Sequence, residues 1–361
     1  IYGMFNQSTL YRIVWQCSSR MDCKIDIVPR LLHFKQPAGT SRGVYTTRKV
    51  WYLRFTSSEF PDRIGIGECA PLPNLSCDDV PGYEQILADM CRKVEQQGGR
   101  LDIEALRDYP SIFFGLETAT RHFFIGDWAL WDTDFSRGKV GIPINGLIWM
   151  GDSKSMLEQI EQKMEIGFRC IKLKIGAINF DEELALLRHI RAHFSSKEIE
   201  LRVDANGAFS PADAMEKLKR LSELDLHSIE QPIRAGQWEE MARLASESPL
   251  PIALDEELIG LNTIEKKQKL LSVIHPQYII LKPSLHGGMI GGGEWIAEAE
   301  KQQIGWWITS ALESNIGLNA IAQWCSIFHN PLPQGLGTGL LFTDNVEMPL
   351  EIRKDCLWYC K

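Results

Sequence analysis

From residue 142 onward the chain alternates short apolar runs with longer amphipathic stretches, a pattern typical of strands followed by helices. Five of the apolar runs end in charged side chains, which recur along the chain at steps of 25 to 30 residues. That length accommodates one strand, one helix and two short loops. The runs are residues 170–176, 201–207, 228–232, 252–256 and 279–283. The pattern predicts an α/β protein built on a (β/α)8-type (TIM-like) barrel with charged residues at one rim.

A barrel of this type needs three further strands. We expect the first at residues 142–148, the seventh at 306–312 and a weakly marked eighth at 334–338. We place the barrel domain at residues 139–340 and expect residues 341–361 to return to the capping domain that precedes the barrel.

The part of the chain before the barrel has a different pattern. Alternating β-rich segments at residues 24–28 and 50–55 flank residues 35–43, whose turn-forming residues predict a mobile loop. Helical spacing follows across residues 82–135. We therefore expect an N-terminal α+β capping domain at residues 21–138, and we expect residues 1–20 to be an extension outside the fold.

Composition excludes several classes of function. The 361 residues are 44% hydrophobic and 24% charged, and the formal net charge is −8. An acidic chain has little with which to neutralise phosphates, so we expect no nucleic-acid partner. No apolar run reaches about 18 residues, so we expect no membrane span. Nine cysteines without a CxxC motif favour a reduced, cytoplasmic protein.

Three carboxylates end successive predicted strands and are therefore expected to meet in one barrel mouth. They are Asp204, Glu230 and Asp255. Three hard oxygen ligands suit Mg2+ or Mn2+ rather than Zn2+. Any one of them alone is as readily a structural carboxylate, but three at matched positions favour a metal site. We expect Asn206 and Glu256 to support these ligands, the alternatives being a turn residue and a helix cap.

Three lysines share the same rim. Lys172 and Lys174 are two residues apart and face the same side of one strand, and Lys282 ends a strand across the mouth. A lysine in a strand interior is costly unless it is paired or functional. We expect Lys172 to bridge carboxylates and Lys174 and Lys282 to act in catalysis. Arg202 shares a strand face with Asp204, so we expect it near Lys174, where its charge would lower the pKa of Lys174.

These parts suit a small-molecule substrate that carries a carboxylate. A metal ion binds the substrate carboxylate, and a lysine removes the weakly acidic proton from the adjacent carbon. Fixed positive charge at the developing oxyanion accounts for most of the reduction in the activation barrier. The sequence does not decide between a monomer and a homo-oligomer.

The order of the motifs Lys-x-Lys, Asp-x-Asn, Glu-Gln-Pro, Asp-Glu and Lys-Pro resembles the enolase superfamily, in its muconate-lactonising branch, over roughly residues 24–340. That superfamily uses lysine or histidine bases together with Mg2+. The resemblance implies Lys174 as acid/base on one face of the substrate and Lys282 on the opposite face. It also implies that the metal ligands are Asp204, Glu230 and Asp255.

Two segments, residues 201–206 and 309–317, are similar to those of the o-succinylbenzoate synthases of this branch. Residues 334–338 lack the Asp-x-Asp that dipeptide epimerases of the branch usually show. The resemblance implies a dehydration in menaquinone synthesis. We then expect Ser310, Glu313 and Ser314 to contact or shape the succinyl end of the substrate, and capping of the following helix is the alternative for all three. We expect the loop at residues 39–43 to close over the substrate, with Arg42 meeting a carboxylate; a plain solvated surface loop is the alternative.

Two other functions stay open on the sequence alone. An N-acylamino-acid racemase or epimerase would use the same site, with Lys174 and Lys282 both exchanging protons. A catalytically silent barrel that serves as a binding scaffold is the third possibility.

Overall fold

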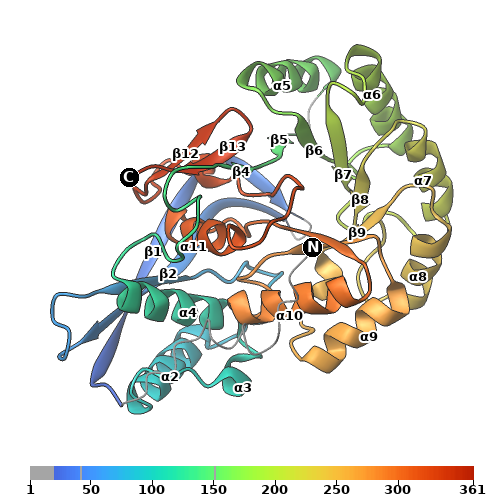
Figure 1. Cartoon of the computed structure of the whole chain (residues 1–361). Coiled ribbons are helices and arrows are strands. Elements are labelled where there is room, and N and C mark those ends of the chain that lie inside the picture. Colours follow the sequence, from blue (N-terminus) through green and yellow to red (C-terminus); the bar gives the residue numbers. More distant parts are fainter. Residues whose placement is uncertain (1–19, 41–42, 150–151) are drawn as a thin grey trace.

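A computed structural model describes residues 20–40, 43–149 and 152–361 (Figure 1). Apart from Arg20, the predicted N-terminal extension lies outside the described residues.

The N-terminal unit is an antiparallel sheet of three strands, covered on one face by helices. The strands are β1 (Cys23–Thr40), β2 (Gly43–Ser57) and β3 (Gly65–Cys69). The helices are α2 (Tyr83–Gln96), α3 (Ile103–Leu106) and α4 (Pro110–Ile125). Successive strand side chains point to opposite faces, so Trp51, Leu53 and Phe55 all pack into one apolar core against the helices.

The predicted loop at residues 35–43 is largely strand. β1 continues to Thr40 and β2 begins at Gly43, and the two pair as a long hairpin with a register shift between His33 and Ala38. Ala38 is buried in an apolar cluster with Leu32, Phe34, Val50, Ala70 and Phe342. Tertiary packing of this one alanine therefore overrides the turn-forming character of its neighbours.

Seven parallel strands follow in the order in which they occur along the chain, and the sheet they form is curled (Figure 1). They are β5 (Gly146–Ile148), β6 (Cys170–Lys174), β7 (Glu200–Asp204), β8 (Ser228–Glu230), β9 (Ile252–Leu254), β10 (Tyr278–Leu281) and β11 (Gly305–Ile308). The connecting segments contain α5 (Ser153–Ile166), α6 (Phe180–His193), α7 (Ala214–Ser222), α8 (Trp238–Glu247), the 3-10 helix η1 (Glu256–Leu258), α9 (Ile264–Ile274), α10 (Gly288–Lys301) and α11 (Asn315–Cys325). Parallel strands buried on both faces read as continuous apolar runs, which is why the sequence marks them clearly.

The two edges of the curled sheet are linked by isolated bridges. Gln334 pairs with Ile144, and Gly335 pairs with Thr309, both in parallel. The predicted first strand is divided into β4 (Ile142–Pro143) and β5, because β4 pairs with the C-terminal part of the chain instead.

The C-terminal segment contacts both parts of the molecule. After the 3-10 helix η2 (Gly339–Leu341), Phe342 stacks on Phe34 of the cap hairpin with ring centroids 4.5 Å apart. β12 (Leu350–Arg353) and β13 (Cys356–Tyr359) then form an antiparallel sheet with β4. None of the helices in the described ranges combines the length and apolar character needed to cross a bilayer.

Candidate active site

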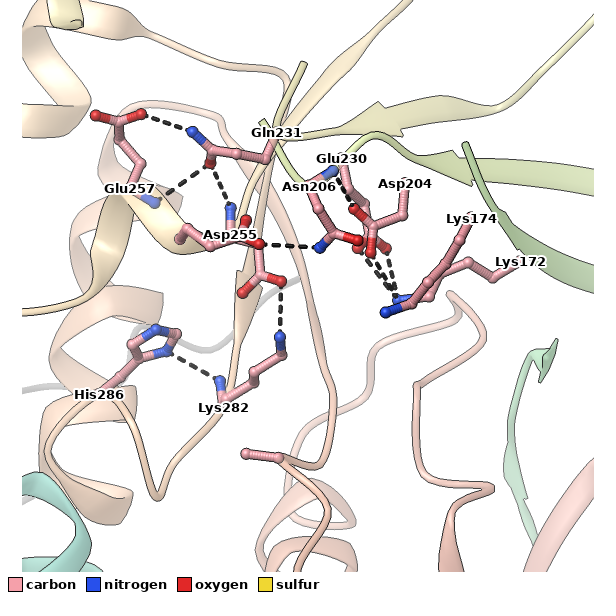
Figure 2. Close-up of polar contacts among 12 residues, drawn as sticks. Lys172, Lys174, Asp204, Asn206, Glu230, Gln231, Asp255, Glu257, Lys282 and His286 are labelled. Carbon is pink, nitrogen blue, oxygen red and sulfur yellow. Dashed lines mark hydrogen bonds and ion pairs between the residues drawn. The ribbon is translucent and has the colours of Figure 1, made fainter. Parts of the chain in front are cut away.

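The parallel register places the charged strand ends side by side. Lys174 lies opposite Asp204, and Asp204 lies opposite Glu230, on three neighbouring strands. Asp255 and Lys282 directly follow β9 and β10, at the same end of the sheet. Figure 2 shows these side chains converging from five consecutive strands. Equal spacing along the chain thus becomes proximity in space, as the sequence predicts.

Lys172 bridges two of the carboxylates. Its Nζ lies 3.2 Å from Glu230 Oε2 and 3.7 Å from Asp204 Oδ2. Burial lowers the pKa of Lys172, but Glu230 and Asp204 more than offset this and hold the pKa above its ordinary value. Burial, followed by the charges of Asp204 and Asp255, raises the pKa of Glu230 to about 8 despite Lys172. Two buried carboxylates therefore share the ammonium group of Lys172.

Across the mouth Lys282 Nζ lies 2.7 Å from Asp255 Oδ2. Burial lowers the pKa of Lys282, but Asp255 and Glu256 outweigh it, so the pKa is raised and the ammonium form is favoured. Burial and then the charges of Asp255 and Asp204 raise the pKa of Glu256 to about 7. Asn206 connects Glu256 with Asp204. Its Nδ2 donates to Glu256 Oε1 at 2.9 Å, and its main-chain N–H donates to Asp204 Oδ1 at 2.9 Å.

Lys174 differs from the other two lysines. Its Nζ donates to the main-chain oxygen of Gly39, at 2.5 Å, so its ammonium group meets the cap hairpin rather than a carboxylate. Burial, with the charges of Lys172 and Lys282, lowers the pKa of Lys174 below its ordinary value although Asp204 opposes this. A lysine that releases its proton more easily than usual is suited to act as a base.

The donor set fits a hard divalent cation. In the described part of the chain no three His, Cys, Asp or Glu side chains form a group that could hold a metal ion, and Lys172 and Lys282 form ion pairs with Glu230 and Asp255. Asp255 Oδ1 and Glu256 Oε2 are nevertheless buried without a hydrogen-bond partner. Such oxygens are costly to bury unless a cation satisfies them, and carboxylate oxygens are the ligands that Mg2+ and Mn2+ prefer.

The ends of the strands are held in place by three residues that the sequence does not mark as functional: Gln231, Glu257 and His286. Gln231 has a positive φ of 39°, and its Oε1 accepts the main-chain N–H groups of Asp255 and Glu257. Gln231 Nε2 donates to Glu257 Oε2 at 2.8 Å. His286 Nδ1 accepts the main-chain N–H of Lys282 at 2.9 Å (Figure 2). The only sequence signal for Gln231 is its place after Glu230 in Glu-Gln-Pro, and His286 has none.

The expected placement of Arg202 is wrong. Its Nη1 donates to the main-chain oxygen of Pro333 at 2.9 Å, and its guanidinium lies 4.3 Å from the Trp307 ring centroid. The side chain therefore points toward the start of β7, away from Lys174. Arg202 and Asp204 do share a face, but two residues of a strand separate them by roughly 7 Å along the barrel axis.

Glu313 and Ser314, two of the expected substrate contacts, are buried and bonded within the protein. Glu313 is fully buried, where its oxygens accept from Ser284 Oγ at 2.5 Å and from the Ala311 N–H at 2.8 Å. Ser314 is also fully buried and is the N-cap of α11. Both side chains already have hydrogen-bond partners within the protein, so both predicted contacts are corrected to structural roles.

Of the remaining expected contacts, Ser310 follows β11 at the mouth, where its Oγ lies 2.6 Å from Thr338 Oγ1. Arg42 lies outside the described residues, as do Ser41 and the side chain of Thr40.

A mouth of carboxylates between two lysines, at the end of a curled parallel sheet, defines an enzyme that removes a proton from the carbon next to a carboxylate. Comparison with known proteins agrees with this class. Residues 155–358 match the family described as Enolase C-terminal domain-like. An o-succinylbenzoate synthase of Desulfotalea psychrophila is 49% identical over 89% of this chain and 95% of its own length.

The chain belongs to the enolase superfamily and, within it, to the family of the o-succinylbenzoate synthases. The crystal structure of MenC from Desulfotalea psychrophila has a TM-score of 0.82 at 43% identity and covers 93% of this chain and 99% of that one. An N-succinylamino acid racemase of Thermus thermophilus is 31% identical over 77% of this chain and 75% of its own length.

Proposed function

We propose that the protein catalyses the Mg2+-dependent syn-dehydration of 2-succinyl-6-hydroxy-2,4-cyclohexadiene-1-carboxylate to 2-succinylbenzoate, as an o-succinylbenzoate synthase of menaquinone biosynthesis. It is then a carbon–oxygen hydro-lyase. The observation that carries the proposal is the contrast between two lysines on opposite sides of the mouth. Lys174 donates to the main-chain oxygen of Gly39 and has a lowered pKa, whereas Lys282 is ion-paired with Asp255 at 2.7 Å.

Asp204, Glu230 and Asp255 are the proposed ligands, with Asn206 and Glu256 supporting them. Mg2+, or Mn2+ in its place, would supply positive charge beside the substrate carboxylate as the adjacent carbon loses its proton. Lys172 forms ion pairs with Glu230 and Asp204, so it is proposed to favour the ionised form of both carboxylates.

The two lysines have different roles. The neutral Nζ of Lys174 takes the proton from the carbon that bears the carboxylate, and the electron pair delocalises into that carboxylate. Lys282 stays protonated and stabilises the anion from the opposite side by its charge. The 6-hydroxyl then leaves on the face of Lys174, takes the same proton and departs as water. The ring becomes aromatic, which supplies the driving force.

The lowered pKa of Lys174 makes the rate depend on pH in a definite direction. The base is active when neutral, so kcat/KM should rise with unit slope as pH increases and level off at a pH below the ordinary lysine value. The measurement is kcat/KM for the dehydration across this range. A rate that falls as pH rises there would contradict a neutral Lys174 as the base.

We also infer that Gln334 and Gly335 take the place of the eighth strand of a (β/α)8 barrel, since they bridge its two edges. Ser310 is the remaining described candidate for contact with the succinyl arm. Ser310 Oγ and Thr338 Oγ1 lie 2.6 Å apart, so two hydroxyl groups are available to bind the succinyl arm.

Racemisation of N-succinylamino acids is the second candidate, supported by the similarity to the racemase of Thermus thermophilus. Racemisation requires both lysines to exchange protons, and the ion pair of Lys282 with Asp255 disfavours Lys282 as a base. Incubation with an N-succinylamino acid in deuterated water separates the two functions. Rapid deuterium uptake with inversion, together with no dehydration of the cyclohexadiene substrate, would assign the site to the racemase instead.

A further inference from the structure

The cap sheet turns a row of polar residues toward the loop that follows β11. Arg48 and Tyr52 lie on one face of β2, and Glu68 of β3 is the register partner of Tyr52. The opposite face carries Leu53 and Phe55, which pack into the cap core. The same face also carries the buried apolar Val50. Buried polar groups require partners, and those of Arg48 and Glu68 lie partly in the cap and partly in the barrel.

Arg48 joins the cap to this loop. Its side chain is buried and donates to four main-chain oxygens. Two of these are in the cap, Pro71 at 2.6 Å and Ala70 at 2.6 Å. The other two are in the loop, Ala311 at 3.1 Å and Leu312 at 3.1 Å. A guanidinium presents five donors in a rigid fork, which suits it to hold two segments together.

Leu312 has a backbone conformation that needs such support. Its φ is 62°, in the left-handed region that residues with a Cβ seldom adopt. Its side chain packs against the apolar cluster of the cap hairpin, and its main-chain oxygen accepts from Arg48. Strained backbone persists only where its surroundings enforce it, and here the cap enforces it.

Glu68 secures the other end of the same loop. One of its oxygens accepts the Ser314 N–H at 2.8 Å and the other accepts the Gly317 N–H at 3.0 Å, in the first turn of α11. The Ser314 hydroxyl also donates to Glu68, and Tyr52 Oη donates to Ser314 Oγ at 2.9 Å. A Cβ on Gly317 would lie 2.7 Å from Glu313 Cβ, so glycine permits this close approach.

The same cap hairpin also reaches the proposed base. Gly39 of β1 pairs with Val44 of β2 and accepts the hydrogen bond from Lys174. One sheet therefore contacts both Lys174 and the loop that carries Ser310, on different sides of the mouth.

We propose that Arg48 and Glu68 are positioning residues that hold residues 309–314 in the shape that binds the substrate, with Leu312 kept in its left-handed conformation by Arg48. The identity of the substrate in this inference rests on the proposed function, whereas the geometry of the loop is independent of that function. Loss of Arg48 lets Leu312 relax to an ordinary conformation and moves Ser310. Because Ser310 is the proposed contact of this loop with bound substrate, and the loop does not carry the proposed base, KM should change more than kcat.

The test compares Arg48→Gln with the double variant Arg48→Gln/Leu312→Gly. We expect R48Q to raise KM for the cyclohexadiene substrate about ten- to a hundredfold with a smaller change in kcat, a range typical of misplaced binding groups. Amide hydrogen exchange of residues 310–317 should become faster. Glycine adopts positive φ without strain, so the double variant should recover part of the lost KM.

Arg107→Gln is the matched control. Arg107 is also a buried cap arginine that binds the barrel, through Glu294 at 2.8 Å and the Asn262 oxygen, but it does not touch the loop. We expect it to lower Tm and leave KM unchanged. If R48Q does not fold, Leu312→Val carries the test, because a β-branched residue tolerates positive φ poorly and should raise KM likewise.

Unchanged KM and unchanged exchange in R48Q, or in L312V where that variant stands in, would overturn the inference. Equal KM increases in R48Q and R107Q would also overturn it, because they would indicate general loosening of the cap. A wild-type protein without dehydration activity would refute the proposed function, whereas the exchange comparison would still decide whether Arg48 holds the loop.

Discussion

Replacing Lys174 by alanine is expected to lower kcat for the dehydration by about a hundred- to ten-thousandfold, the range attributed to a positioned general base. Lys174 has a lowered pKa and donates to Gly39 instead of to a carboxylate, so its removal leaves no buried acid without its partner. The fold and the response to Mg2+ should therefore be retained. The measurement is kcat with saturating substrate, together with Tm with and without Mg2+.

Lys197→Ala provides the control, since Lys197 is exposed and remote from the mouth. It should leave kcat unchanged. A Lys174→Ala enzyme with kcat close to the wild-type value would remove Lys174 from the mechanism. A variant that had also lost its Mg2+ response would show instead that Lys174 helps to build the metal site.

The second large effect concerns the metal site. Glu230 lies between Asp204 and Asp255, and their charges, after burial, raise its pKa to about 8. Mg2+ binding to the wild-type protein should stabilise it by about 2.7 kcal/mol at a hundred times Kd, which corresponds to a rise of several degrees in Tm. Glu230→Gln removes the central negative charge, so we expect no rise in Tm and no measurable dehydration.

Glu117→Gln is a closely matched control for this variant. Glu117 is likewise buried with a pKa raised by burial to about 8, but it accepts from the Met289 N–H at the start of α10. Its substitution should leave the Mg2+-dependent rise in Tm intact. If Glu230→Gln showed the same rise as the wild-type protein, the metal ligands would have to lie elsewhere. If the wild-type protein itself showed no rise, the protein would be a scaffold without a metal.

The central features of the site could be predicted because they depend on short-range patterns. An apolar strand ending in a charged residue is visible within about six residues of sequence, and the topology then brings all such ends to one rim. This pattern is sufficient to place Asp204, Glu230 and Lys282 at the mouth of the barrel. The curled parallel sheet followed from the same repeat.

The remaining features depend on contacts between residues far apart in the chain. Arg48 and Leu312 are separated by 264 residues, and no local pattern in the sequence connects them. Arg202 was misplaced because a strand face specifies the side on which a side chain lies, not the end of the barrel toward which a long side chain extends. Ala38 lies among turn formers, and its segment is a strand because Ala38 pairs with Tyr45 of β2 and is buried with Leu32, Phe34, Val50, Ala70 and Phe342.

The most direct test of the proposed function is a single assay on the purified wild-type protein. The cyclohexadiene substrate is supplied with Mg2+, and formation of the aromatic product is followed by absorbance, with and without excess chelator. Conversion with kcat of about 1 s−1 or more, abolished by the chelator and restored by added Mg2+, is the result expected for an enzyme of this class. No conversion, or conversion that the chelator does not affect, would contradict it.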